Sequence, residues 1–551
     1  MRVLLCVLFA ASAFAQSNPG QSNPCGGTPA WSPCDWSFDL NPSEDPSVFE
    51  LRIEFRSPTK HKTYLLHAFR DGDRRFTIRF TPTEAGTWDY RLTSNLKRLE
   101  AETGTFEAAT SDSAGFVKPA NVHHFKTENG KPHLWIASPL DGFLTLSGED
   151  FERTIAQLAN DKFTHVRVTL PANADLREAA DRVRSINKHG LVADVVLESI
   201  PAQGDPRLHY ISDLASRFAA LNITWMGMPA FESVPNARAI LKDTGEILKR
   251  YDPYDHPRTS LAAVTSGALA NDPWTSMVTY ATPDPNIGAV EHQLYGEPAI
   301  NTGIRSAGDL WTATMNGQYP ASGSGEYMAA WINFMSGTRY WELEPYFDLD
   351  GGRAVALPGV EYIVYLEKPG PIEVTLEDHG YDVQWLNPAN GDRVKGKSYR
   401  GAHFTGMPPD QSHPWVLHIY REGEMQSRLR SYDFDSRDTP IQLQEVEINS
   451  EKTPYEVSAP PQGDLTVSKP PGFTLHILRP SRATRSLLIE WTGEITSNGQ
   501  GYRVMGTGRD GTLQFPPALA QSAPASMLVR VYVMNANGKV YEIDKVYGLN
   551  P

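Results

Sequence analysis

The chain has 551 residues and a formal net charge of -14, with 40% hydrophobic and 21% charged residues. A chain of this length exceeds one ordinary domain and indicates about three or four. The composition is typical of a folded globular protein. The acidic balance argues against a nucleic-acid partner, because the phosphate backbone binds to a basic surface.

The first 15 residues have the pattern of a signal peptide. Arg2 provides a positive amino end, residues 3–14 form an apolar run, and Ala13 and Ala15 place small residues at the cleavage site. The run is too short to span a bilayer, which disfavours the alternative of a membrane anchor. We therefore expect a secreted or periplasmic protein that is cleaved near Ala15.

Two cysteines remain in the mature chain, Cys25 and Cys34, because Cys6 leaves with the signal peptide. An exported chain meets an oxidising compartment, so residues 16–34 are expected to be a polar lead that contains a Cys25–Cys34 disulfide. A metal site is disfavoured there, since no histidine or second cysteine pair lies nearby to complete a ligand set. The sequence reveals no metal site and no cofactor motif elsewhere.

Residues 35–112 alternate between apolar and polar positions, which is the period of β-strands. Short turn sequences such as Asp71-Gly72-Asp73 separate the runs. The spacing predicts a β-sandwich. Its expected strands are Val48–Phe55, Lys62–Phe69, Phe76–Pro82, Thr87–Ser94 and Gly104–Ala109.

The same region resembles the amino-terminal sandwich of the DUF5060 type, which precedes certain glycoside-hydrolase-like barrels. The residues that carry the resemblance are Asn41-Pro42, Asp71-Gly72-Asp73, Arg79-Phe80-Thr81-Pro82, Glu84, Gly86, Trp88, Tyr90, Ser94-Asn95 and Thr103-Gly104-Thr105-Phe106. Apart from the resemblance, Trp88 and Tyr90 are read as packing residues of the sandwich.

Residues 115–348 alternate between strand-like and helix-like segments, which predicts a parallel (β/α)₈ barrel of the TIM type. A doubly wound sheet is the alternative, but no glycine-rich strand–helix turn favours it. The expected helices are Ser147–Phe163, Asp175–Gly190, Arg207–Leu221, Ala237–Tyr251 and Tyr327–Gly337. The expected strands are His165–Leu170, Leu191–Leu197, Ile223–Met228, Thr259–Thr265, Ser276–Thr282 and Pro298–Ile304, after a first strand that ends near Ser138.

Parts of this region resemble the apiosidase-like, DUF4038 group of glycoside-hydrolase-like barrels. The resemblance rests on HHFKTENGKPHLWIAS near its start, on Leu248–Ser260 and on Leu310–Glu326. Within Leu248–Ser260, the alternative reading is structural, since Pro253 and Pro257 end the helix. Residues 353–422 return to strands, and WLNPANGD resembles a turn of the small β-domain that ends barrels of this group. Residues 427–551 predict a further β-sandwich that resembles no family.

The resemblance implies cleavage of glycosidic bonds, which requires two carboxyl groups on either side of the bond. In such barrels the acid follows strand four and the nucleophile follows strand seven. Here Met226-Gly227-Met228 stands at the first place and Thr302-Gly303 at the second, and Ser138 stands near the usual Asp at the end of strand one. These losses predict a degenerate site.

Two other carboxylates are candidates for the missing pair. Glu232 lies a few residues beyond the expected acid, and Glu342 follows the last barrel helix. Alternatively, Glu232 caps a helix or is solvated, and Glu342 pairs with Arg339 or Arg353. Four aromatic residues are candidates for stacking on sugar rings, although they could equally fill the core: Trp225, Trp274, Tyr280 and Trp341.

Glu291 and His292 fall on an expected helix before strand seven and are interpreted as ordinary surface residues.

Two functional hypotheses follow from the sequence. The chain is either a secreted glycoside hydrolase of polysaccharides with a relocated carboxylate pair, or a catalytically inactive relative that binds glycans or acts as a scaffold. Carbohydrate is the expected partner in both cases.

Overall fold

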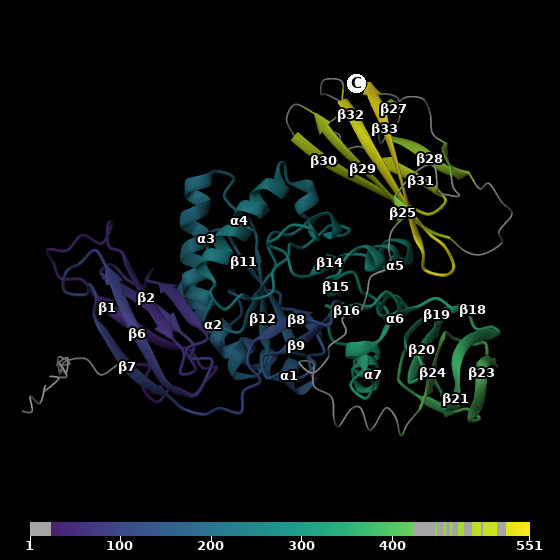
Figure 1. Cartoon of the computed structure of the whole chain (residues 1–551), viewed down its shortest axis with the longest axis horizontal. Coiled ribbons are helices and arrows are strands. Elements are labelled where there is room, and N and C mark those ends of the chain that lie inside the picture. Colours follow the sequence, from purple (N-terminus) through teal and green to yellow (C-terminus); the bar gives the residue numbers. More distant parts are fainter. Residues whose placement is uncertain are drawn as a thin grey trace, which may run out of the picture. The chain divides into compact units, whose positions relative to one another are not determined.

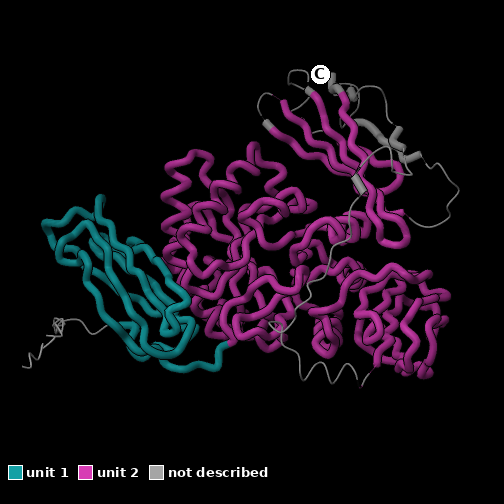
Figure 2. Tube along the Cα trace, viewed as in Figure 1, with its two compact units in different colours: residues 1–113 teal, residues 114–551 magenta. Residues whose placement is uncertain are grey.

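The computed structural model describes residues 24–421, 423, 487–497, 500–514 and 525–550, and the backbone of short strands at 447–448, 456–458, 463–464 and 472–478. The expected signal peptide lies outside the described residues. The chain divides into two compact units, residues 1–113 and 114–551, which Figure 2 distinguishes by colour. The finer domain boundaries within the second unit remain predictions.

The first unit consists of two antiparallel sheets, with strand orders β1-β5-β4 and β3-β2-β6-β7. Strand β2 alternates strictly between buried and exposed residues, as its sequence pattern predicted. The rings of Phe55 on β2 and Phe80 on β5 stack with centroids 4.0 Å apart, so one aromatic core joins the two sheets. The strands are β1 Cys34–Asp39, β2 Leu51–Arg56, β3 Thr63–His67, β4 Phe69–Arg70, β5 Arg75–Phe80, β6 Gly86–Ser94 and β7 Thr103–Ala108.

Cys25 and Cys34 form a disulfide at the start of this unit. The loop between them runs beside the end of β7, where Gly27 N donates to Glu107 O at 2.8 Å and Ala30 N donates to Ala109 O at 2.9 Å. The disulfide therefore holds a chain end against the sandwich.

The second unit begins with a hairpin, β8 Val117–Ala120 and β9 His124–Thr127, followed by strands and helices that alternate (Figure 1). Strands β10 to β13 form one parallel sheet, and β14 to β16 form another. Two isolated parallel bridges extend these sheets, Ala137 with Ala321 and Trp225 with Arg258. The strands are β10 Ala137–Pro139, β11 His165–Leu170, β12 Val192–Leu197, β13 Ile223–Trp225, β14 Val278–Tyr280, β15 Ala299–Asn301 and β16 Gln318–Pro320.

Four of the seven described helices begin at a residue whose side chain caps them. Ser147 accepts from Asp150 N at the start of α1, and Asp175 accepts from Arg177 N and Glu178 N at the start of α2. Asp284 does the same for α5, where Pro285 occupies the first turn. The helices are α1 Gly148–Asn160, α2 Leu176–Lys188, α3 Gly204–Phe218, α4 Ala237–Tyr251, α5 Pro285–Leu294, α6 Ala307–Met315 and α7 Glu326–Met335.

Several elements differ from the sequence prediction. Helix α6 and strand β16 were not predicted, because α6 is short and five of its nine residues are buried, which hides the amphipathic pattern. The strand expected at Thr259–Thr265 is not continuous. Its pairing is limited to the bridges at Arg258 and Thr265.

A β-rich part follows the helices. Strands β17 to β24 form a sheet of order β17-β19-β20-β24-β21-β18, with β22 and β23 paired to β21. The expected combination of an α/β part with β-rich parts is thereby confirmed. The strands are β17 Glu344–Tyr346, β18 Leu349–Asp350, β19 Arg353–Leu357, β20 Glu361–Leu366, β21 Ile372–Leu386, β22 Arg393–Lys395, β23 Tyr399–Gly406 and β24 Trp415–Tyr420.

The carboxyl-terminal strands form a sheet of order β25-β33-β32-β29-β30 and a smaller sheet of order β26-β28-β31, while β27 pairs with β33. Among the described residues, no helix has the length and apolar character needed to cross a bilayer. The strands are β25 Glu447–Ile448, β26 Glu456–Ser458, β27 Gly463–Asp464, β28 Gly472–Leu478, β29 Leu488–Ser497, β30 Gln500–Thr507, β31 Asp510–Gln514, β32 Ala525–Met534 and β33 Val540–Asn550.

Removing the disulfide with the double substitution Cys25→Ser and Cys34→Ser should destabilise the first unit by about 2–3 kcal/mol, because the short loop no longer restricts the unfolded chain. Hydrogen exchange followed by mass spectrometry should show faster exchange in peptides around Gly27 and Ala30. Peptides from the second unit should be unchanged. Equal exchange in the wild-type and double-substituted chains would contradict a stabilising role.

Glu297, in the turn between α5 and β15, provides a test of pH dependence. Its Oε1 accepts from Thr275 Oγ1 at 3.1 Å, while Oε2 is buried without a hydrogen-bond partner among the described residues. Burial raises the pKa of Glu297 to about 8. The folded state therefore favours the protonated carboxyl, since the pKa in an unfolded chain is about 4.3.

The contribution of Glu297 to stability is thus fully present below about pH 4 and is lost as the pH rises through about 8. Glu297→Gln, which keeps the shape without ionising, should raise the Tm relative to the wild type at about pH 8.5 and leave it unchanged at about pH 4. The matched control is Glu246→Gln, on an exposed position of α4. The same Tm difference at both pH values would refute the assignment.

Candidate functional site

The carboxyl ends of β13 and β15 are where the sequence comparison expected a pair of carboxylates, and each holds a tightly packed glycine instead. A Cβ atom at Gly227 would lie 2.7 Å from Ser260 Oγ and 2.9 Å from Thr259 O, and the residue has φ +54°. A Cβ at Gly303 would lie 2.2 Å from the backbone oxygen of Ala281. Neither position has room for any side chain.

Glu232 lies just beyond the first of these glycines, in the short helical turn Phe231–Ser233. Its carboxylate accepts hydrogen bonds from Ala263 N at 2.8 Å and Val264 N at 3.2 Å. Both oxygens therefore bind the backbone of a neighbouring loop. This arrangement is not the helix cap weighed from the sequence; it makes Glu232 a group that holds two loops together.

Glu342 is placed elsewhere. It is 3% exposed and forms an ion pair with Arg339, whose guanidinium lies 5.0 Å from the centre of the Trp341 ring. Pairing with Arg339 was one of the two alternatives weighed from the sequence. Two residues further on, Glu344 contacts His292 in the last turn of α5, which leads into the amino end of β15. Glu232 instead follows the carboxyl end of β13, so the structure does not bring Glu232 and Glu342 together.

The four aromatic candidates are all buried, with exposures of 1% for Trp225, 3% for Trp274 and Tyr280, and 5% for Trp341. Trp225 Nε1 donates to Asp252 Oδ2 at 3.0 Å, which fixes its ring in the interior. As they lie, these rings fill the core and present no face on which a sugar could stack. The core interpretation accounts for them.

Asp252 and His256, in the segment DPYDHPR, form a buried pair. His256 Nδ1 lies 3.0 Å from Asp252 Oδ1, and Tyr254 N also donates to this carboxylate. Burial by itself would raise the pKa of Asp252, but His256 and Trp225 outweigh it and lower the pKa to about 2. The segment thus has the structural role that its prolines suggested.

A chain of polar groups that sequence reasoning missed lies among β11, β12 and β13. His133 Nε2 is 2.9 Å from His165 Nε2, and His165 Nδ1 is 2.7 Å from Asp194 Oδ1, which also accepts from Thr224 Oγ1 at 2.7 Å. Burial, with His165 beside it, lowers the pKa of His133 well below its usual value. His165, Asp194 and Thr224 are fully buried, so these hydrogen-bonded side chains are not accessible to solvent.

Three histidines surround Glu344. Its Oε2 lies 3.0 Å from His123 Nδ1 and 2.6 Å from His292 Nε2, and its Oε1 lies 3.1 Å from His124 Nε2. Burial alone would raise the pKa of Glu344, but the hydrogen bonds from His123, His124 and His292 hold it well below the usual range. Burial and the adjacent His123 lower the pKa of His292 to about 4.

The interpretation of Glu291 and His292 as surface residues is wrong. They are 0% and 6% exposed, because α5 packs on both sides. One side faces the strands, and the other contacts β29, where Ile489 N donates to Asn286 Oδ1 at 3.0 Å. No spacing within α5 itself indicates this second contact, since its partner lies some 200 residues away.

Glu291 belongs to a further buried group with Glu490 on β29 and Arg503 on β30. An Arg503 nitrogen lies 4.0 Å from Glu291 Oε1 and 3.9 Å from Glu490 Oε1. Burial, together with the neighbouring Glu291, raises the pKa of Glu490 well above its usual value. One cation thus serves two buried carboxyl groups, so one of them is favoured in the protonated form.

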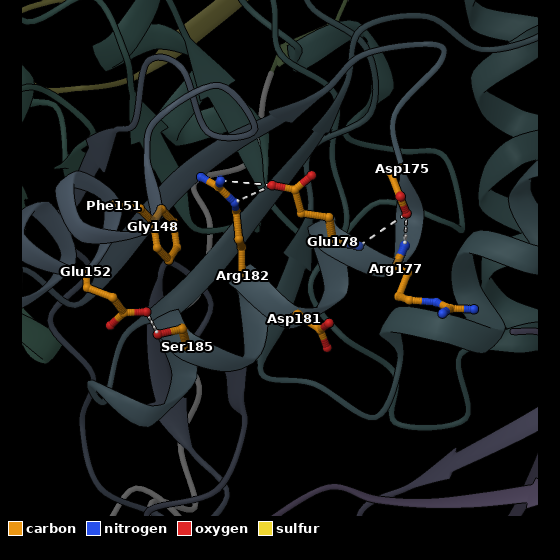
Figure 3. A pocket seen from close by; sticks show the side chains of 9 residues that line it. All are labelled: Gly148, Phe151, Glu152, Asp175, Arg177, Glu178, Asp181, Arg182 and Ser185. Carbon is orange, nitrogen blue, oxygen red and sulfur yellow. Dashed lines mark hydrogen bonds and ion pairs between the residues drawn. The ribbon is translucent and has the colours of Figure 1, made fainter.

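A pocket of 570 Å³ lies on the outside of α1 and α2 (Figure 3). Arg182 pairs with Glu178 at 2.9 Å within it, and Phe151 contributes the one aromatic ring of its lining. The pocket is formed by the surfaces of helices, and it does not include the strand ends where catalytic residues were expected. It is lined by Gly148, Phe151, Glu152, Asp175, Arg177, Glu178, Asp181, Arg182 and Ser185.

Comparisons with known proteins identify one domain of the chain and relate its fold to solved structures. Residues 27–95 match the family model described as domain of unknown function DUF5060, as the sequence resemblance predicted. No curated protein matches the chain.

Among solved structures, one described as a "putative glycoside hydrolase" from Bacteroides vulgatus is similar with a TM-score of 0.59 and 16% identity, and the match covers 72% of this chain and 99% of that one. A glycoside hydrolase family 5 protein from the same species matches with a TM-score of 0.49 and 13% identity over 56% of this chain and 94% of that one, too weak a likeness to support an argument. The chain therefore carries a DUF5060 domain and has a glycoside-hydrolase-like fold.

Proposed function

We propose that this protein is an exported, carbohydrate-binding relative of the barrel glycoside hydrolases that does not hydrolyse glycosidic bonds. The observation that carries the proposal is the pair of packed glycines, Gly227 and Gly303, at the two strand ends where catalytic carboxylates belong. Export is supported by the signal-peptide pattern of residues 1–15 and by the Cys25–Cys34 disulfide, which forms in oxidising compartments.

The proposal includes a (β/α)₈ barrel of the TIM type as the central domain. It is supported by the two parallel sheets, β10 to β13 and β14 to β16, and by the bridges that continue them. The bridge between Ala137 and Ala321 joins the first strand to the segment after the last. The bridge between Trp225 and Arg258 adds a short fifth strand after β13.

Hydrolysis with two carboxyl groups requires that they lie about 5–5.5 Å or about 6.5–9.5 Å apart on either side of the bond. Of the two candidates, Glu232 binds backbone amides beyond β13, and Glu342 is paired with Arg339 near the end of α5. We therefore assign neither of them to catalysis. A glycan-binding role needs no carboxylate pair, and it keeps carbohydrate as the partner expected from the resemblance.

The competing function is hydrolysis by a relocated site, for which Glu232 is the one carboxylate near the expected place. The two functions differ in a direct test. Tag-free mature chain, starting at Gln16, is mixed with soluble plant and microbial polysaccharides. Binding is measured by affinity electrophoresis, and released reducing sugar is measured on the same samples, with the heat-denatured chain as the blank.

We expect retarded migration on at least one polysaccharide, with no sugar released above the blank. The matched variant Glu232→Gln should bind the same polysaccharide with unchanged affinity. Sugar release that Glu232→Gln abolishes would establish the competing function. Failure to bind any polysaccharide would overturn the binding role itself.

The close packing at Gly303 makes a second prediction. Gly303→Ala should lower the stability of the chain by about 1–3 kcal/mol, because its Cβ meets the backbone oxygen of Ala281. The control is Gly323→Ala, where a Cβ meets nothing within 4 Å. Thermal unfolding of both variants is compared with the wild type. Equal Tm values for the two alanine variants would show that a side chain, and hence a carboxylate, can be accommodated at this strand end.

A further inference from the structure

We propose that His123, His292 and Glu344 form a structural binding site for a divalent transition-metal ion at the amino ends of the parallel strands. In an exported protein, this ion would be Zn²⁺. This site goes beyond the carbohydrate-binding role and does not depend on it. The sequence indicated no metal ligands, because the three residues are far apart in the chain. His123 directly precedes β9, His292 lies in the last turn of α5, and Glu344 begins β17.

The three side chains converge on one point. His123 Nδ1, His292 Nε2 and one carboxylate oxygen of Glu344 all lie within 4.8 Å of one another. Zinc bonds of about 2.0–2.1 Å in tetrahedral geometry require ligand atoms about 3.3–3.4 Å apart. The observed separations of 3.0 and 2.6 Å from Glu344 Oε2 are shorter than this, so an ion would spread the ligands by several tenths of an ångström.

Hydrogen-bond accounting at His123 favours a cation. His123 Nε2 lies 3.0 Å from the carbonyl oxygen of Tyr295, which can only accept, so Nε2 carries the hydrogen. A neutral His123 then directs the lone pair of Nδ1 at Glu344 Oε2, which also has only lone pairs. A positive ion between Nδ1 and Oε2 would remove the repulsion between their lone pairs. The Nε2–H group would still donate to the Tyr295 carbonyl, as is usual for metal-bound histidines.

The remaining ligands are compatible with this arrangement. His292 Nδ1 is buried without a hydrogen-bond partner among the described residues, so no neighbour prevents Nε2 from presenting its lone pair. His124 Nε2 donates to the other carboxylate oxygen, Glu344 Oε1, and His124 Nδ1 lies 2.7 Å from the hydroxyl of Tyr319. His124 thereby orients the carboxylate and acts as a positioning residue.

Two imidazoles and one carboxylate suit Zn²⁺ and related ions of the first transition row. His123 and His292 are 2% and 6% exposed, and their rings lie 3.8 Å apart, which is typical of an enclosed structural site. The ion would join the hairpin before β10, the helix α5 and the strand β17. These segments are more than 50 residues apart in the sequence, and the Glu344 carboxylate on β17 already contacts the other two.

The alternative is a purely protonic cluster in which His123 is an imidazolium paired with Glu344. A zinc titration separates the two. Tag-free mature chain is stripped of metal with a chelator, dialysed and titrated with Zn²⁺ alone by calorimetry. The Tm of the stripped and reloaded chains is then measured.

We expect one Zn²⁺ per chain and a Tm that rises on reloading. Glu344→Gln and His292→Gln should each weaken Zn²⁺ binding by about 100-fold or more and abolish the rise in Tm. The matched control is His418→Gln, since His418 is also buried and lies 2.7 Å from a carboxylate oxygen of Glu361, and no second histidine of the described residues contacts that carboxylate. It should bind Zn²⁺ like the wild type.

Co²⁺ in place of Zn²⁺ gives a readout independent of stability, because its visible absorption reports a site of low coordination number. The wild type and His418→Gln should show this absorption, and Glu344→Gln should not. A stripped wild-type chain that binds no Zn²⁺, or that binds it equally well after both Glu344→Gln and His292→Gln, would overturn the proposal and favour the protonic cluster.

Discussion

The Glu344 carboxylate lies against histidine rings that come from two other parts of the chain, and this contact joins the segment before β9, the helix α5 and the start of β17. Removing a carboxylate from water costs several kcal/mol unless partners replace the lost hydration. Here His123, His124 and His292 replace it. The same solution recurs in the pairs His165–Asp194, His256–Asp252 and His418–Glu361, all of which are buried. Histidine is thus a recurrent partner of buried acids in this unit, beside the arginines that pair with Glu342, Glu291 and Glu490.

At the carboxyl ends of the strands β13 and β15, close packing leaves no room for further side chains. Gly227 and Gly303 let neighbouring backbones approach so closely that no side chain fits, and Glu232 binds the amides of the adjoining loop. A site that cleaves glycosidic bonds needs open space and two ionisable groups that face it. The fold resembles that of glycoside hydrolases, whereas neighbouring atoms lie close against Gly227 and Gly303. The proposed loss of hydrolysis therefore rests on packing as well as on residue type.

Much of the architecture follows from local pattern. Alternation in residues 35–112 predicted the strands β2, β3, β5, β6 and β7 of the first unit, and the sequence pattern predicted the helices α1 and α2. The absence of an acid directly after Trp225 was equally visible in the sequence. Prediction failed for the helix α6 and for the burial of α5, because helices buried on more than one side lose the amphipathic period on which sequence reasoning depends. Glu291 and His292 were misplaced for this reason.

The sequence by itself determined most of the strands and helices and the cysteine pair, since each depends on residues that are near one another in the chain. Only the tertiary structure decided which side chains meet. Glu344 lies 221 residues from His123 and 52 from His292, and no local pattern encodes such a contact. It likewise decided that Trp225 and Trp341 are core residues, because burial is a property of the packed chain and of no single segment.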